Sequence, residues 1–529
     1  MHESSSRPGP ESYDVAVVGG AFSGAAAALL LRRWLPGCRI AVVERQPRFG
    51  RKVGEATVEL SGLFLTRVLG LYDHLLRDHL PKHGLRFWFA ADAGDPLEAL
   101  SEVGPARVSA LPSFQLDRSV LDERVLAQAA AEGIEVLRPA KVTAVELSPA
   151  GSRLEVQTAD GARQLSARWV IDASGRQTFL GRRLGLVEKV EEHPTAAAWA
   201  RWRGVADLDG RALLGPDVRR PRLPAVAASR RLATNHFCGY GWWCWAIPLA
   251  GGETSVGLVY DKRLFAWPVE GKVEERYRDF VTRRVAGLRE LLAGATMDGE
   301  DFLAYQHLPY RCRRYMGDGW ALVGDAAAFI DPYYSPGLDH ASISIYATAR
   351  IVRDELTGEL GGEALAARIA RHNEDWERSY ERWIGALYLD KYEILGDAEL
   401  TAASFLFDTG MYYLGVVGPV WQDLEALGDP VLGLDIPQVR WSYRVMRAFR
   451  RRMVRLARFR RQAGTYGRRN LGWRFHPARF EIERPRALKL VRQGLGLWWR
   501  VEMEYLRYRL RHGRVDVSPP APRPVEAHG

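Results

Sequence analysis

The sequence predicts an α/β fold that combines a Rossmann-type domain, a second domain built on a β-sheet and a C-terminal helical region. Three observations support this. An apolar strand near the N-terminus runs directly into a glycine-rich turn and an alanine-rich helix. Three later apolar strands end at a glycine or an acidic residue, as is typical of strands whose carboxyl ends meet at one edge of a parallel sheet. Beyond residue 361, apolar residues recur at helical spacing instead.

The N-terminal strand, residues 15–18, leads into the turn GGAFSG at residues 19–24. Such a turn presents free backbone N–H groups and the positive end of a helix dipole to a pyrophosphate. A second strand over 39–43 ends at Glu44, where a carboxylate can accept hydrogen bonds from the ribose of an adenosine. Ala21 replaces the second of the three expected glycines and is the smallest possible departure. The unit therefore predicts a dinucleotide site.

Two further strands complete the predicted parallel sheet. The strand over 320–323 ends at Gly324 and Asp325 before a helix, and an intermediate strand spans 169–171. In that position Asp325 can hydrogen-bond the ribityl hydroxyls of a flavin, while the helix N-terminus faces the isoalloxazine and the pyrophosphate. These segments together resemble the p-hydroxybenzoate-hydroxylase-like flavoproteins over residues 13–356.

This resemblance implies that FAD is the cofactor, present as FADH2 during turnover, and it also places the segment 115–118 and Asp122 near the flavin. The predicted FAD-binding residues are Gly19, Gly20, Ala21, Ser23, Gly24, Glu44, Arg45, Gln115, Arg118, Gly324, Asp325 and Gly337. Only one complete fingerprint is present. Reducing equivalents must therefore come from a transiently bound nicotinamide or, as free reduced flavin, from a separate flavin reductase.

Three further segments narrow the family. They are VGEAT at 53–57, PKHGLRFW at 81–88 and WCWAIP at 243–248, the last a full match to W-x-W-x-I-P. They resemble the corresponding segments of the flavin-dependent halogenases, in which two tryptophans near the flavin disfavour substrate hydroxylation. Trp243 and Trp245 are the matching residues. The alternative is that they are packing residues of a half-buried strand.

The halogenase resemblance implies a lysine that receives hypohalous acid from the flavin side and delivers the halogen to the substrate. An ammonium donates hydrogen bonds to such an oxidant, and an amine can become a haloamine. Lys82 is the matching residue, because a glycine and an aromatic strand follow it as in the family. A solvated surface lysine is the alternative.

The segment 330–340 corresponds to the halide pocket of that family. The resemblance places halide near Ser335 and Gly337, but proline has no N–H to offer at position 336, where family members carry Ser or Thr. Tyr334 stands where tryptophan halogenases have a catalytic glutamate, so the sequence predicts phenols or pyrroles rather than free tryptophan. For Asp339 and His340 we expect helix capping and packing, with a proton relay as the alternative.

We expect the following organisation: a disordered tail over 1–12, an FAD-binding domain over 13–360 with a substrate sheet domain interleaved at about 58–115 and 185–310, a basic helical domain over 361–515, and a disordered tail over 516–529. The four scattered cysteines predict buried small side chains and neither a metal site nor a disulfide framework. No run of 18 uncharged apolar residues and no secretory signal is present, so we expect a cytoplasmic protein, with peripheral membrane contact as an option.

The net charge of +10 is concentrated late in the chain. Residues 440–514 contain 23 Lys or Arg and four Asp or Glu. Three interpretations compete: a solvated helix face, contact with an acidic acyl-carrier protein that holds the substrate, and adsorption to an anionic membrane, which Trp498 and Trp499 would support. Nucleic acid is not expected, since no recognition module accompanies the charge.

The sequence therefore predicts an FAD-dependent oxidoreductase of the halogenase or monooxygenase type. The leading hypothesis is a halogenase that uses FADH2, O2 and chloride or bromide. Its substrate would be a small, electron-rich aromatic or conjugated molecule, either free or bound to a carrier. Lys82, Trp243, Trp245 and Tyr334 are its candidate catalytic residues. The alternatives are an FAD monooxygenase or dehydrogenase on the same scaffold, and a reductase of the geranylgeranyl reductase type.

Overall fold

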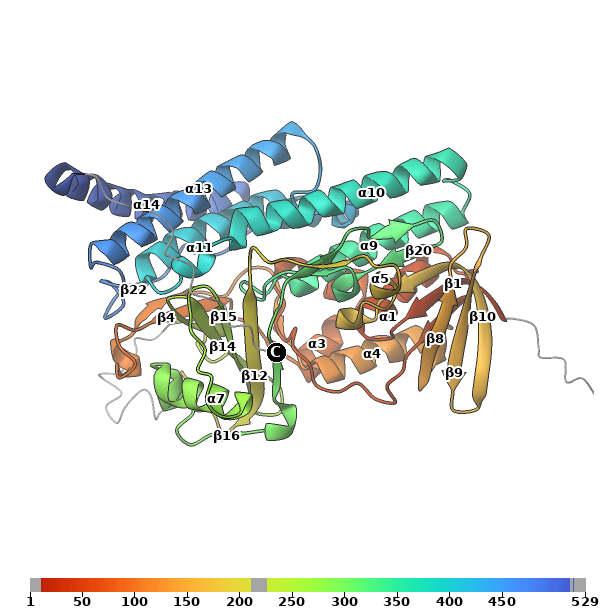
Figure 1. Ribbon diagram of the computed structural model, residues 1–529, viewed down its shortest axis with the longest axis horizontal. Helices are drawn as coiled ribbons and strands as arrows, with labels where there is room; N and C mark the ends of the chain where they lie inside the picture. The colour runs from red at the N-terminus through yellow and green to blue at the C-terminus, as the bar shows by residue number, and fades with distance from the viewer. Residues whose placement is uncertain (1–10, 211–225, 514–516, 518–529) are drawn as a thin grey trace, which may run out of the picture.

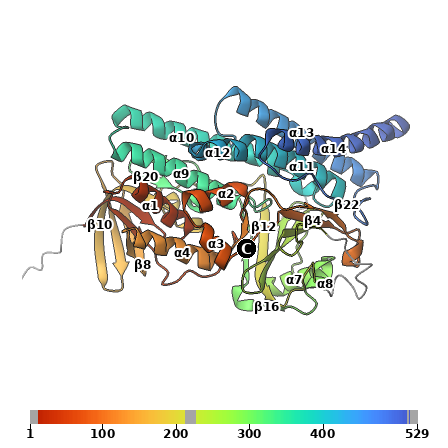
Figure 2. The same ribbon diagram turned by 180° about the vertical axis from the view of Figure 1, so that it is seen from behind.

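The computed structural model describes residues 11–210, 226–513 and 517, and it contains the three predicted parts (Figure 1). Two sheets lie next to each other, and long C-terminal helices extend over both of them (Figures 1 and 2). The predicted N-terminal tail lies outside the described residues except for Glu11 and Ser12, which already belong to strand β1 (Glu11–Val18). The predicted C-terminal tail lies outside them except for Val517.

The Rossmann-type sheet has the predicted parallel core. Strand β1 pairs in parallel with β2 (Ile40–Val43) on one side and with β10 (Gly161–Asp172) on the other. Strand β20 (Trp320–Leu322) pairs in parallel with β10, and β7 (Glu135–Leu137) pairs in parallel with β2. The four predicted strands are therefore neighbours in the order β20, β10, β1, β2. Their carboxyl ends face one edge of the sheet, which is where ligands bind in such folds.

Close backbone packing explains two glycines of the N-terminal turn. A Cβ on Gly24, in the first turn of α1 (Phe22–Trp34), would lie 1.8 Å from the carbonyl oxygen of Gly19. Gly19 itself has a φ of +101°, and a Cβ there would lie 2.6 Å from the carbonyl oxygen of Ala173. Because neither glycine has a side chain, α1 can lie against the sheet and point its N-terminus at the strand ends.

The second sheet forms the substrate domain. Its strand order is β16 (Thr296–Met297), β12 (Thr195–Arg203), β15 (Glu253–Asp261), β14 (Trp242–Pro248), β13 (Thr234–Gly239), β4 (Leu85–Phe89), β5 (Ser101–Val103) and β22 (Arg474–Phe475), with β17 (Leu303–Tyr305) also paired to β12. Two features differ from the prediction. The edge strand β22 comes from the C-terminal region, and residues 59–78 pack into the core of the FAD-binding domain instead of the substrate domain.

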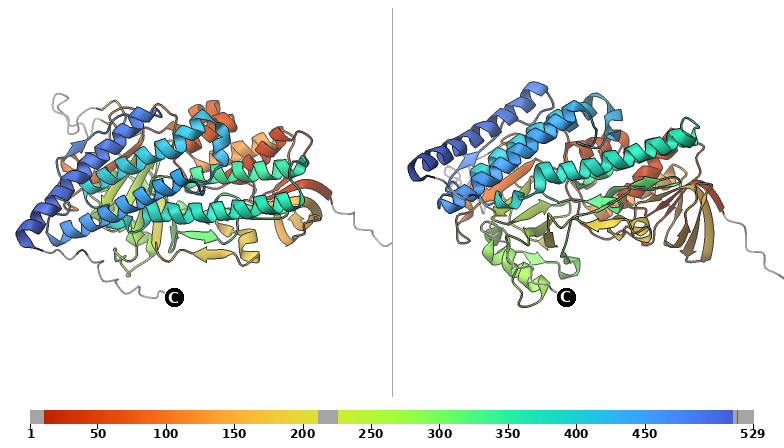
Figure 3. Two further views of the ribbon diagram at one scale, coloured as in Figure 1. Left: turned by 90° about the horizontal axis from the view of Figure 1, so that it is seen from above. Right: turned by 45° about the horizontal axis from the view of Figure 1, so that its top comes forward.

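The C-terminal region is helical as predicted, and its helices lie across the two sheet domains (Figure 3). They are α10 (Gly362–Trp383), α11 (Ala398–Tyr412), α12 (Gly418–Gln422), α13 (Pro437–Gln462) and α14 (Arg484–His512), and they follow α9 (Gly337–Leu356). The segment 398–422 is long and apolar enough to cross a membrane, contrary to the sequence-based expectation. Because 67% of its apolar window is buried inside the fold, it has the burial of a core helix. The four cysteines are free and buried, as predicted.

Replacement of Gly24 by Ala is expected to abolish FAD retention, because the new methyl group would collide with the Gly19 backbone and push α1 away from the cofactor edge. The purified variant should lack the flavin absorbance that the purified wild-type protein shows. Gly37→Ala is the matched control, since a Cβ at Gly37 has no atom within 4 Å. A Gly24→Ala protein that retains flavin as the control does would contradict this packing argument.

Candidate active site

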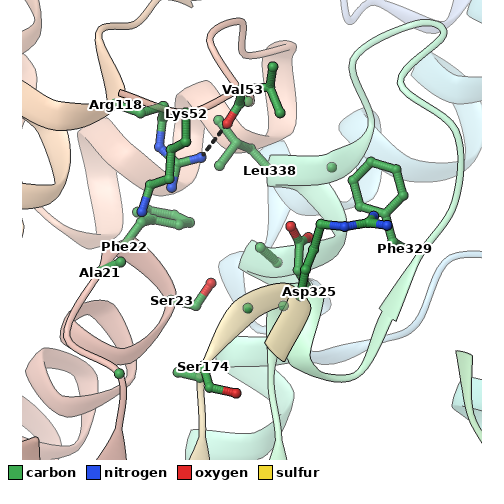
Figure 4. A pocket seen from close by; sticks show the side chains of 18 of the residues that line it. Ala21, Phe22, Ser23, Lys52, Val53, Arg118, Ser174, Asp325, Phe329 and Leu338 are labelled. Atoms are coloured by element: carbon green, nitrogen blue, oxygen red, sulfur yellow. Dashed lines mark hydrogen bonds between the residues drawn. The ribbon is translucent and has the colours of Figure 1, made fainter. Parts of the chain in front are cut away.

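A cavity of about 830 Å³ lies at the carboxyl edge of the Rossmann-type sheet. Figure 4 shows Ala21, Phe22 and Arg118 on one side of it and Asp325 across from them. Of the predicted FAD-binding residues, those that line the cavity are Gly19, Ala21, Ser23, Glu44, Arg45, Arg118, Gly324, Asp325 and Gly337. Gly20 and Gly24 do not line it. Gln115 does not line it either, because its side-chain amide is turned to Thr234, with Nε2 donating to Oγ1 over 3.1 Å.

The Glu44 carboxylate is fixed at the end of β2 by two backbone donors. Its Oε2 accepts the N–H of Gly20 over 2.8 Å, and its Oε1 accepts the N–H of Gln46 over 2.8 Å. Burial raises the pKa of Asp325, and the charges of Arg176, Arg118 and Lys52 oppose that shift. Both carboxylates line the same cavity, where they can accept hydrogen bonds from ribose and ribityl hydroxyls.

Cationic side chains gather over the N-terminus of α1. The buried Asp122 accepts the N–H of Phe22 over 3.2 Å and Nη2 of Arg118 over 3.1 Å, and it forms an ion pair with Lys52. Arg118 and Lys52 thereby reinforce the positive helix terminus at the site expected for a pyrophosphate. Lys52 was not among the predicted residues, because no motif spacing marks it. This polar, cationic cradle fits FAD.

The W-x-W-x-I-P strand forms part of the cavity wall. Trp243 and Trp245 are both buried in β14, and both line the cavity. Trp245 donates through Nε1 to Oγ of Ser255 over 3.0 Å. Trp243 donates through Nε1 to the hydroxyl of Tyr392 over 2.9 Å, so its indole also ties the sheet to the C-terminal helical region.

That tie continues to the loop that follows the Gly-Asp strand. The Tyr392 hydroxyl donates to Oδ2 of Asp331 over 3.0 Å, and Nε2 of the buried His193 lies 2.8 Å from the same oxygen. Oδ1 of Asp331 accepts the N–H of Tyr333 over 2.9 Å. The carboxylate of Asp331 is therefore held from three directions, and the loop begins from a fixed point.

The loop then adopts a backbone that non-glycine residues rarely adopt. Tyr334 has a φ of +75° and Ser335 a φ of +60°, two consecutive residues in the left-handed region. Such conformations cost about 1 kcal/mol or more each and persist where the surroundings enforce them. They bring Pro336 to the N-terminus of α9, where it borders the FAD cavity on one side and a second cavity on the other.

The second cavity has a volume of about 150 Å³ and contains Lys82 on its wall. Lys82 is 3% exposed, so the interpretation as a solvated lysine is wrong. Its Nζ donates to the carbonyl oxygen of Thr57 over 2.7 Å. Burial lowers the pKa of Lys82 to about 8, and the charges of Glu59 and Asp339 oppose that shift. An amine with this pKa changes protonation state near neutral pH.

Asp339 and His340, in the first turn of α9, serve packing. Asp339 accepts the N–H of Ser61 over 2.8 Å and the hydroxyl of Tyr412 over 2.7 Å, and burial raises its pKa to about 6. His340 packs edge-on against Trp383 with ring centroids 5.3 Å apart, and burial lowers its pKa to about 4. These contacts join α9 to neighbouring elements rather than capping its own first turn.

Comparison with known proteins agrees with this geometry. The FAD-binding-domain family model FAD_binding_3 matches residues 12–220. A flavin-dependent halogenase of Dictyostelium discoideum is 27% identical over 65% of this chain and 60% of its own length. A 1H-pyrrole-2-carbonyl-[peptidyl-carrier protein] chlorinase of Pseudomonas fluorescens is 27% identical over 62% of this chain and 73% of its own length.

The chain contains an FAD-binding domain, and it is similar to flavin-dependent halogenases over 60% of the length of the first of these relatives. The predicted cofactor, FAD, is confirmed. The crystal structure of the halogenase PltM has the same fold, with a TM-score of 0.69, 20% identity and coverage of 93% of this chain and 96% of that chain. PltM is also known in complex with phloroglucinol and FAD.

Lys82→Met is expected to stabilise the protein at neutral pH. Because the pKa of Lys82 falls from its usual value of about 10.5 to about 8 on folding, the folded state disfavours the ammonium. This cost, at most about 3 kcal/mol, is fully present below pH 8 and disappears as the pH rises to about 10.5. We therefore expect the difference in unfolding free energy between Lys82→Met and wild type to shrink over that range in denaturant titrations. A difference independent of pH would contradict the burial of a titrating Lys82.

Proposed function

We propose that the protein is a flavin-dependent halogenase that acts on a small electron-rich aromatic ring held beside Lys82. The observation that carries this proposal is the arrangement of two cavities on either side of Pro336. The FAD cavity contains Trp243 and Trp245, and the smaller cavity contains a buried lysine of lowered pKa. Neither an FAD monooxygenase nor a dehydrogenase needs a buried amine at a distance from its flavin.

Bound FAD, when reduced, supplies together with oxygen the oxidising power that converts halide to hypohalous acid. The chain's own contribution is to hold halide and oxidant. Pro336 has no N–H, so we assign halide binding to the hydroxyl of Ser335 and to the N–H of Gly337, which heads α9 and has no intrahelical acceptor. Both residues line the FAD cavity.

Lys82 then holds the oxidised halogen for the substrate. Its Nζ makes one hydrogen bond, to Thr57, so the remaining N–H groups or the lone pair of the neutral amine face the smaller cavity. A cavity of about 150 Å³ is large enough for a benzene-sized ring. The substrate class fits the phloroglucinol bound by PltM, and Tyr334 on the wall disfavours the larger free tryptophan.

Purified protein supplied with reduced FAD, oxygen and bromide should brominate members of a panel of phenols and pyrroles. Lys82→Met should reduce brominated product by at least about 100-fold, because the substrate cavity would lose its halogen donor. Lys189→Met, at an exposed lysine of the substrate domain, is the matched control. Mass spectrometry that finds oxygenated product unchanged by bromide would establish the monooxygenase alternative instead. Hydrogenated or desaturated product without oxygen uptake would establish the reductase or dehydrogenase alternative.

We further propose that a separate flavin reductase supplies the reduced flavin, and that the cytoplasmic enzyme attaches to anionic surfaces through α14. Part of the basic excess is internal: the buried Arg460 lies within 3 Å of carboxylate oxygens of Asp397, Glu399 and Glu504. The outer face of α14 is different. Its exposed basic residues are Arg484, Arg486, Lys489, Arg492, Arg500, Arg507, Arg509 and Arg511, whereas its acidic residues Glu502 and Glu504 are engaged by α13.

An apolar stripe runs along the same helix. Leu488, Leu495, Trp499, Leu506 and Leu510 are all exposed, and their spacing of seven and four residues places them on one face. A basic helix with such a stripe suits the interface of an anionic membrane better than an acidic protein alone. An acidic carrier protein is the other candidate, since one relative acts on a carrier-bound substrate according to its name.

Liposomes that contain phosphatidylserine should carry the protein upward in flotation, and neutral liposomes should not. Trp499→Asp should abolish flotation, because it places a carboxylate in the apolar stripe. Trp441→Asp, at an exposed tryptophan of α13, should leave flotation intact. Failure to float, with salt-sensitive retention of the protein by an acidic carrier protein, would favour the carrier over the membrane.

A further inference from the structure

A second buried lysine lies close to the substrate cavity. Lys391 is 1% exposed, and its Nζ lies 2.6 Å from Oδ2 of Asp408 and 2.6 Å from Oγ of Ser404. Asp408 and Ser404 both belong to α11, one helical turn apart. Nothing in the arrangement around Lys82 requires this pair. A buried ion pair is costly to desolvate, so its presence calls for a reason beyond stability.

The hydrogen bonds to Asp408 are all made by one of its two oxygens. Oδ2 accepts from Lys391, from the hydroxyl of Ser404 over 3.2 Å and from the hydroxyl of Tyr334 over 3.2 Å. Among the described residues Oδ1 has no hydrogen-bond partner. It is also not one of the polar side-chain atoms that are fully buried without a partner, so its surface is accessible. Asp408 also lines the smaller cavity. Its Oδ1 is therefore open to that cavity and can accept a hydrogen bond there.

The surroundings of Oδ1 suit an aromatic ring. The ring of Tyr334 lies 5.9 Å from that of Phe405, and Phe405 lies 5.9 Å from Phe480, with all three lining the cavity. The Nζ atom of Lys391 contacts the carboxylate of Asp408 directly, over 2.6 Å. The cavity thus offers aromatic walls, a carboxylate acceptor and the amine of Lys82.

The other two carboxylates of the cavity are less suitable. Asp339 uses both of its oxygens, for Ser61 and Tyr412. Glu59 accepts the hydroxyl of Tyr413 over 2.6 Å, and it has no direct lysine contact of the kind that Asp408 has. Asp408 alone combines a free oxygen with a contacting ammonium in the part of the chain that the structure describes.

We propose that Asp408 is a further catalytic residue, which accepts the hydroxyl proton of a single-ring phenolic substrate, with Lys391 as its positioning residue. The proposal rests on the proposed halogenase function. Transfer of the phenol proton raises electron density at the ring carbons ortho and para to the oxygen, which is where an electrophilic halogen adds.

The ring carbon takes halogen from hypohalous acid held by the Lys82 ammonium, a carbon–halogen bond forms, and the halogen–oxygen bond breaks. The departing hydroxide takes a proton from Lys82 to give water, and the phenol proton passes to Asp408, which leaves a halogenated dienone. The dienone then loses its ring C–H proton to the Lys82 amine and regains the oxygen proton from Asp408. The carbon is oxidised by two electrons and the halogen is reduced by two.

A pair of variants isolates the carboxylate. Asp408→Asn alone would leave Lys391 buried without its counter-ion, which costs several kcal/mol and can unfold the protein. The double variant Lys391→Met/Asp408→Asn removes both charges. Lys391→Met alone keeps the Asp408 carboxylate, to which the hydroxyls of Ser404 and Tyr334 still donate, so the two variants differ by one carboxylate. The assay compares bromination of a phenol with that of its methyl ether, which has no proton to give.

We expect Lys391→Met to weaken the preference for the phenol over the ether without abolishing it, because the positioning residue is lost and the carboxylate is kept. The double variant should lose about 100-fold of the preference, the scale of general acid–base catalysis. A merely structural ion pair would lower both rates together and leave the ratio unchanged, which would overturn the proposal. Loss of the ratio in Glu59→Gln, with retention in the double variant, would also overturn it, because Glu59 would then be the acceptor.

Calorimetric binding of the phenol and the ether to the FAD-loaded protein separates this proposal from the halogenase function. If no halogenated product forms with wild type, the halogenase function fails. Tighter binding of the phenol by Lys391→Met than by the double variant would still support Asp408 as the hydroxyl acceptor. Equal binding by the two variants would contradict it.

Discussion

The position of the 330–336 loop is the constraint on which the rest of the site depends. Asp331 accepts hydrogen bonds or close contacts from Tyr392, His193 and the N–H of Tyr333, and Tyr392 is itself tied to Trp243 of the W-x-W-x-I-P strand. This network fixes the start of a loop whose left-handed residues set Pro336 between two cavities. The tryptophan motif therefore has two roles. It forms part of the cavity wall, and through the hydrogen bonds from Trp243 to Tyr392 and from Tyr392 to Asp331 it helps to hold the loop in place.

The smaller cavity is built from buried polar groups whose interactions differ in kind. Lys82 has one carbonyl partner and a lowered pKa, whereas Lys391 is matched by a carboxylate and a hydroxyl. Three tyrosine hydroxyls each bond a carboxylate at its wall, in the pairs Tyr334–Asp408, Tyr412–Asp339 and Tyr413–Glu59. Burial makes each unpaired group costly, so the groups left open to the cavity are those available to a substrate.

Local sequence patterns were sufficient to predict the Rossmann-type unit, because its strand, turn and terminal acid lie within a short stretch. Lys82 was singled out in the same way, by the glycine and the aromatic strand that follow it. Gln115 does not line the cavity itself, but it donates to Thr234, which does, and its neighbour Arg118 reaches the cavity. The segment 398–422 escaped the search for uncharged runs because Glu399 and Asp408 interrupt it.

Asp408 could not have been found from the sequence. It lies 74 residues from Tyr334 and 17 from Lys391, in a helix whose pattern otherwise indicates a core element, and only the packing of α11 brings these groups together. The most direct test of the account is anomalous X-ray diffraction from crystals of the FAD-loaded protein soaked in bromide. We predict a bromide peak between Ser335 and the N–H of Gly337, next to Pro336. A well-ordered FAD with no bromide at that position would contradict it.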